Sequence, residues 1–211
     1  MFFVIGLKAG FIIAITLLPA AIWIAKLGSN GYRGASFAAA LACLLAQSFW
    51  FLISALGIFV ILDQLPRAPV LLEVFSSLVL LFLAYRYFSA PQAKSLAVED
   101  PGKASGIFAQ TFLRALAMPI RLPLTMAVMV AVGTHLRYPG ELVGFPELVA
   151  GAIIGAAIWW LELAFLAAVI APRVSQPVTL RSLNRLRPLS ALLFLILACI
   201  TLLFLAGGPR G

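Results

Sequence analysis

The chain consists of long apolar runs separated by short polar segments. Six such runs can be drawn, at residues 2–25, 36–62, 70–89, 107–132, 147–171 and 188–207. A helix that crosses a bilayer needs about 20 predominantly apolar residues, and each run is near that length. The runs are too long for the roughly ten-residue alternating strands of a membrane barrel. The pattern therefore predicts an all-α integral membrane protein with six transmembrane helices and the lipid bilayer as its surroundings.

The two halves of the chain share a short sequence pattern. Residues 6–19, GLKAGFIIAITLLP, and residues 106–119, GIFAQTFLRALAMP, each place a proline thirteen residues after a glycine. Because each half has three spans, the second half starts on the opposite side of the membrane, which gives the inverted repeat found in secondary transporters. We therefore predict a single membrane domain, residues 1–211, with repeat halves of about 1–90 and 106–207. Helix breaks at Pro19 and Pro119 would then approach each other near the midplane. Chance similarity in an apolar background is the alternative.

The fourth run combines charge with broken backbone. Arg114 and Arg121 are seven residues apart, two helical turns, so a continuous helix would carry both on one face. Pro119 and Pro123 have no amide hydrogen, so the carbonyls four residues earlier, including that of Ala115, lose their helical donors. Broken backbone and charge at this depth need protein or water beside them. We interpret the segment as a polar site, the alternative being two arginines that reach the headgroups from the ends of the span.

Glu162, Gln47, Ser48, Gln110 and Thr125 are the other polar residues of interest inside the apolar runs, and two of them are candidates for a site. Glu162 stands within IWWLELAF, where an unpaired carboxylate is costly, so we expect it to face protein and to meet Arg121 or Arg114. It would serve either as a proton-coupling acid or as half of a fixed ion pair. The other is the amide of Gln47 in the second run. The candidate substrate-binding residues are therefore Arg114, Arg121, Pro19, Pro119 and Gln47.

Small residues predict close helix packing. Gly6, Gly10 and Ala14 recur at four-residue spacing in the first run, and Gly151 and Gly155 repeat the spacing in the fifth. Such stripes let two helices approach closely inside a membrane. We assign them to packing rather than to direct contact with substrate.

Composition and charge narrow the function. Hydrophobic residues make up 64% of the chain and charged residues only 10%, whereas charged residues are about 25% of soluble proteins. The net charge of +8 comes from scattered residues with no basic run, which argues against nucleic acid as a partner. The first, third and fifth loops carry nine lysines and arginines against four on the other side. The positive-inside bias therefore predicts a multi-pass protein of the inner (plasma) membrane with both termini non-cytoplasmic.

Several kinds of site are disfavoured. The single histidine, His135, and the scarcity of intramembrane acids argue against a metal site or a histidine-ligated cofactor. Cys43 and Cys199 lie in separate apolar runs, where a thiol behaves as a small hydrophobe. A Ser/His/Asp set and a nucleotide loop are both missing, so we expect no enzyme and no cofactor.

The layout resembles the LysE/RhtB family of amino-acid exporters. The resemblance rests on six runs in 211 residues, a proline mark in the first and fourth runs, the loop GYRGA at 31–35, and VFSSLVLLFLAYRYFSAP at 74–91. Where that family has Pro-Gly-Pro, this chain has Pro19, Ala20 and Ala21. Where the family has Asn-Pro-Lys, the chain has Met118, Pro119 and Ile120, followed by Arg121.

The resemblance implies a secondary exporter of an amino acid or similar small metabolite. In this hypothesis Arg121 and Arg114 hold the carboxylate of a zwitterionic or anionic substrate, and Glu162 couples export to protons. The altered motifs favour a second hypothesis, a non-transporting LysE-like scaffold or accessory subunit of a larger membrane complex. Its partners would be other membrane subunits, whereas an exporter would act alone or as a homodimer.

Overall fold

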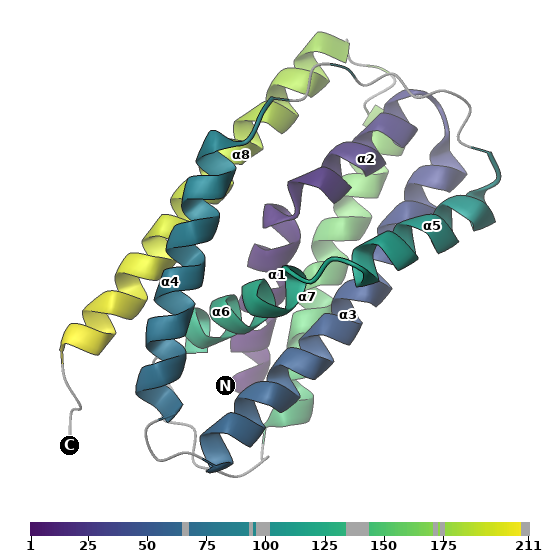
Figure 1. The fold of residues 1–211 in the computed structure, drawn as a ribbon. Coiled ribbons are helices and arrows are strands. Elements are labelled where there is room, and N and C mark those ends of the chain that lie inside the picture. Colours follow the sequence, from purple (N-terminus) through teal and green to yellow (C-terminus); the bar gives the residue numbers. More distant parts are fainter. Residues whose placement is uncertain are drawn as a thin grey trace.

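The computed structural model is a bundle of helices (Figure 1). It describes residues 1–64, 68–92, 95, 102–133, 144–170, 173 and 176–207; His135 lies outside them. The helices are α1 (Phe2–Thr16), α2 (Leu18–Ser29), α3 (Arg33–Gln64), α4 (Ala68–Ser89), α5 (Ala104–Leu116), α6 (Arg121–Gly133), α7 (Phe145–Phe165), the π-helical turn η1 (Leu166–Ile170) and α8 (Gln176–Ala206). Strands are absent from these ranges, which confirms the all-α prediction for the described part of the chain.

Four to six membrane spans can be recognised among the described residues. Four helical stretches are continuous and apolar enough to cross a bilayer, namely 33–62, 68–89, 145–170 and 181–206. Two helix pairs are bent at a short break: α1 meets α2 at 67°, and α5 meets α6 at 69°. Counting each bent pair as one span gives the number that the sequence predicts. Only α8 differs much from its predicted boundary, because the helix continues through Pro188 and the basic residues before it.

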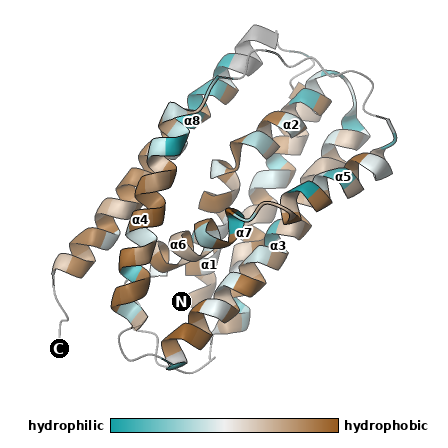
Figure 2. Cartoon of the chain, in the orientation of Figure 1, coloured by the Kyte–Doolittle hydropathy of each residue, from teal (hydrophilic) through white to brown (hydrophobic). Residues whose placement is uncertain are grey.

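The outer surface of the bundle is apolar, as expected for helices in lipid. On α3 a single stripe exposes large side chains, those of Leu41, Leu45, Phe49, Leu52, Leu56 and Val60. The opposite side of the same helix is buried and built mainly from small residues such as Ala39, Cys43 and Ala46. Figure 2 shows hydrophobic residues along most of the length of the helices. Large residues face lipid and small ones let the helices approach.

Helices α1 and α7 run side by side in the same direction with their backbones in close contact. A Cβ atom built on Gly10 would lie 2.0 Å from the carbonyl oxygen of Ala152, and one on Gly155 would lie 2.1 Å from that of Leu7. Gly6 and Gly151 are equally tight against the opposite backbone. The predicted packing role of both glycine stripes is confirmed, because no side chain fits between the two helices at these positions.

The remaining contacts put α6 in the middle of the bundle. It packs against α1, α3, α4 and α8, while α5 packs mainly on α3. Most of α6 is buried, and the hydroxyl of Ser76 on α4 donates a hydrogen bond of 2.7 Å to the carbonyl of Ala127 on α6. The beginning of α6, where Arg121 lies, is therefore buried inside the protein.

Candidate functional site

A cavity of about 880 Å³ lies where the two broken helices meet. The first break contributes Leu17, Leu18 and Pro19 to its wall, and the second contributes Ile120 and Arg121. The end of α4 closes another side with Tyr87 and its neighbours. The two breaks, about a hundred positions apart in the sequence, thus share one cavity.

Both breaks have a local cause in proline. At the first, the chain leaves the helical conformation at Leu17, with φ −81° and ψ 62°, and α2 begins with Pro19 in its first turn. At the second, α5 ends at Leu116 and α6 starts at Arg121, so Pro119 lies in the link. Proline cannot donate to the preceding turn but is accepted in the first turn of a new helix. The predicted helix breaks at Pro19 and Pro119 are confirmed.

The backbone freed by Pro119 finds a replacement donor. The carbonyl of Ala115, which Pro119 cannot serve, accepts a hydrogen bond of 3.3 Å from the indole Nε1 of Trp50 on α3. A carbonyl without a partner in a membrane is costly, so this bond stabilises the end of α5 against α3. Trp50 therefore supports the break from outside the cavity.

We expect Trp50→Phe to destabilise the folded protein by about 1 kcal/mol, because the Ala115 carbonyl loses its donor while the ring volume is largely kept. The measurement is thermal unfolding in mild detergent. Trp159→Phe is the matched control, since the buried Nε1 of Trp159 has no hydrogen-bond partner. Equal loss in both variants would assign the effect to ring volume and not to the hydrogen bond.

Arg121 is the central charge of the cavity. Its side chain is only 4% exposed, and its Nε and Nη1 have no hydrogen-bond partner. Cys43 and Tyr87 are the groups beside the guanidinium. Acidic residues are missing from the described part of the cavity wall. A buried guanidinium with free donors is suited to bind a carboxylate or another planar anion.

The other candidates of the fourth run are placed differently. Arg114 lines the same cavity, but it is exposed near the end of α5. The expectation that Arg114 and Arg121 share one helix face is wrong, because the 69° bend separates them. Pro19 lines the cavity, whereas Pro119 is exposed and contributes through its neighbours Met118 and Ile120. Both prolines shape the cavity by breaking a helix, and only Pro19 lies in the cavity wall.

Gln47 lies outside the cavity wall. It is 1% exposed, and its side-chain oxygen accepts a hydrogen bond of 2.9 Å from Nε1 of Trp160 on α7. This bond joins α3 to α7 inside the bundle. The structure thus gives Gln47 a structural contact in place of the expected contact with substrate.

Glu162 does not occupy the expected position. The side chain is exposed on α7, and its expected proximity to Arg121 or Arg114 is not found. Helix α7 packs against α1 and α3, whereas α5 packs mainly on α3. In the described part of the chain, neither α5, which carries Arg114, nor α6, which begins at Arg121, has an extensive contact with α7.

We expect Glu162→Gln to keep transport near the wild-type level, because the carboxylate is exposed and does not line the cavity. Initial rates of efflux from proteoliposomes, with and without a proton gradient, measure this. Loss of gradient-driven efflux in the variant, with unchanged thermal stability, would restore Glu162 to the proton-coupling role.

Three residues stand out among the cavity residues that were not predicted as site residues. Tyr87 and Arg187 line the wall from α4 and α8, and Cys43 lies beside Arg121. Tyr87 belongs to the segment at 74–91 that carried part of the family resemblance, which was a usable signal. Arg187 was counted only among the nine basic loop residues, and its place next to Pro188 at the start of the sixth run was not used as a signal. Groups of three or more His, Cys, Asp or Glu that could hold a metal ion are absent from the described residues.

A comparison with protein families completes the description of the site. A family model for the LysE type translocator matches residues 11–204, which include both helix breaks and Arg121. No curated protein and no solved structure is significantly similar to the chain. The matched segment includes every residue that lines the cavity in the described part of the chain. The chain belongs to the LysE type translocator family, and it is a membrane protein of the transporter class.

Proposed function

We propose that this protein is a secondary transporter that exports an amino acid or a similar small metabolite through the cavity between the two broken helices. The observation that carries the proposal is Arg121, a buried cation whose Nε and Nη1 lack partners and which lines a cavity of about 880 Å³. Burying a charge without a partner is costly. A substrate carboxylate that binds there supplies the missing partner.

The helix ends strengthen the same site. Helices α2 and α6 both begin at the cavity, with Leu18 and Arg121 in its wall. The first turn of a helix has a partial positive charge, which favours anions. Discontinuous helices whose N-termini point at an anionic group are the usual substrate sites of secondary transporters. The carboxylate would therefore meet two helix N-termini as well as a guanidinium.

We infer an inverted repeat from the way the elements correspond. The bent pair α1–α2 corresponds to α5–α6, with bends of 67° and 69°. Exchanging the halves turns the contact of α1 with α7 into that of α5 with α3, and both contacts are extensive. Rocking of one repeat against the other would expose the cavity to each side in turn. By the charge bias of the loops, the protein lies in the plasma membrane with both termini outside.

Efflux from proteoliposomes tests the proposal. Purified protein is reconstituted, the vesicles are loaded with a panel of labelled amino acids and organic acids, and efflux is compared with that from protein-free liposomes. Export of at least one compound above the protein-free rate supports the exporter. If the whole panel stays at the protein-free rate and other membrane subunits copurify in fixed ratio, the scaffold hypothesis replaces it.

A further inference from the structure

A second hollow adjoins the substrate cavity. It measures about 850 Å³ and lies between the end of α4 and the beginning of α8. The two hollows share Tyr87, Ala90, Pro91 and Arg187 in their walls. The shared residues make the second hollow a vestibule of the first. It lies beside the third and fifth loops, which the charge bias assigns to the cytoplasm.

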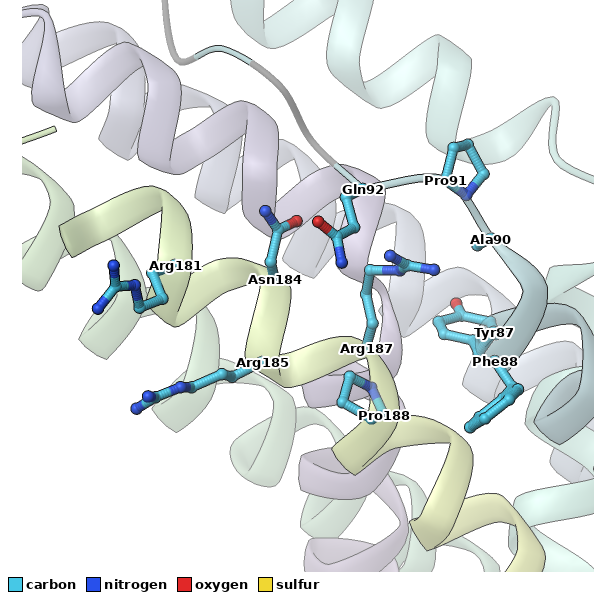
Figure 3. Close-up of a pocket in the computed structure, with 10 residues that line it drawn as sticks. All are labelled: Tyr87, Phe88, Ala90, Pro91, Gln92, Arg181, Asn184, Arg185, Arg187 and Pro188. Atoms are coloured by element: carbon cyan, nitrogen blue, oxygen red, sulfur yellow. The ribbon is translucent and has the colours of Figure 1, made fainter. Parts of the chain in front are cut away.

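Arg187 stands at the junction. In Figure 3 its guanidinium lies between the side chains of Gln92 and Tyr87, whereas Arg181 and Arg185 extend away from Tyr87. Nε of Arg187 is buried and has no hydrogen-bond partner. Arg187 lines both hollows, so a solute that moves from the vestibule to Arg121 passes close to this second guanidinium.

The described walls of both hollows carry charges of one sign. The inner cavity has Arg86, Arg114, Arg121 and Arg187, and the vestibule has Arg181, Arg185 and Arg187. Neither described wall includes an aspartate or a glutamate. A neutral zwitterion has no net charge for this field to attract. A net anion would be attracted along the whole path, because aligned charges of one sign concentrate ions of the other.

We propose that the exported substrate is a net anion, which enters through the vestibule past Arg187 to reach Arg121, and that the membrane potential drives its export. This inference rests on the proposed function. A cell interior is electrically negative, so an anion that leaves moves down the electrical gradient. Export of this kind requires no proton-coupling acid in the path, which agrees with the exposed position of Glu162 on α7.

The charge of the substrate is tested with an isosteric pair. Proteoliposomes are loaded with labelled glutamate or glutamine, which have nearly the same size but differ by one net charge. A potassium gradient with valinomycin then sets an interior-negative potential. We expect faster efflux for glutamate than for glutamine, and acceleration by the potential for glutamate alone. Two results would overturn the inference but leave the exporter proposal in place. One is efflux of glutamine at a rate equal to or above that of glutamate. The other is efflux of glutamate at a rate that does not depend on the membrane potential. Efflux of neither compound, nor of any other in the panel, would overturn the exporter and the inference together.

The path is tested by Arg187→Gln. We expect the internal glutamate concentration that gives half-maximal efflux to rise by about fivefold to tenfold, with a smaller effect on the maximal rate, because a charge at an entrance acts mainly on the encounter with the substrate. Arg33→Gln removes the same charge from an exposed position at the start of α3, outside both hollows. We expect this control to match the wild type. An equal change in both variants would assign the effect to overall charge and overturn the role of Arg187.

Discussion

Arg121→Gln is expected to reduce efflux to the rate of protein-free liposomes while the protein stays folded. Arg121 lines the cavity, and its buried Nε and Nη1 have no hydrogen-bond partner in the wild-type protein. Losing a buried charge-assisted contact of this kind costs about 2–5 kcal/mol in binding, a loss large enough to remove measurable transport. The folded protein loses an unpaired buried charge, so thermal stability in detergent should stay equal or rise. Efflux and thermal unfolding are measured on the same preparation.

Arg121→Lys is the matched control for charge. Lysine keeps the positive charge but has no planar pair of donors, so we expect transport that is weaker than wild type and clearly above Arg121→Gln. Wild-type efflux in Arg121→Gln would remove this arginine from the substrate site. Loss of efflux together with loss of folding would instead make Arg121 a structural residue.

Gly10→Ala is expected to cost about 1–3 kcal/mol in the free energy of unfolding, a typical result of overpacking. The new Cβ would lie 2.0 Å from the carbonyl oxygen and 2.8 Å from Cα of Ala152. Both atoms belong to backbone, so the conflict cannot be relieved by rotating a side chain. Helices α1 and α7 must separate along their contact, and Gly10→Leu should prevent recovery of folded protein. Thermal unfolding and size-exclusion chromatography in mild detergent measure both effects.

Gly57→Ala controls for the intrinsic effect of replacing glycine in a helix. A Cβ at Gly57 would meet only Cε of Met126, at 3.9 Å. Alanine is favoured over glycine inside a helix by about 0.5–1 kcal/mol, so this variant should be as stable as wild type or more stable. Similar stability for Gly10→Ala and Gly57→Ala would contradict the close contact between α1 and α7.

The fold could be predicted largely because the bilayer imposes simple rules on sequence. Run length predicted the helices, and prolines predicted the two breaks. Glycine spacing predicted close helix packing, and the structure shows that the two stripes, on α1 and α7, pack against each other. Each of these features is local, since it depends on residues within a few helical turns. The start of α8 was missed because a helix can continue through Pro188 and through polar residues beyond the apolar run.

The site was harder to predict because it depends on which helices become neighbours. Arg121 was found because charge next to proline in an apolar run is a local signal. The predicted pairing of Glu162 with a span-four arginine is not found, because among the described residues α7 makes no extensive contact with α5 or α6. The contact of Gln47 with Trp160 could not be predicted either, because Trp160 lies 113 positions away in the sequence, on another helix. The place of Arg187 next to Pro188 was not used as a signal, and its role became visible only where α4 and α8 meet.

The central claim is that Arg121 binds the substrate in the cavity between the two helix breaks. Its most direct test is isothermal titration calorimetry in detergent, using the compound that the wild-type protein exports fastest. Wild-type protein and Glu162→Gln should bind that compound with the same affinity, and Arg121→Gln should give no measurable binding. Undiminished binding by Arg121→Gln, or binding that is lost only in Glu162→Gln, would contradict this account.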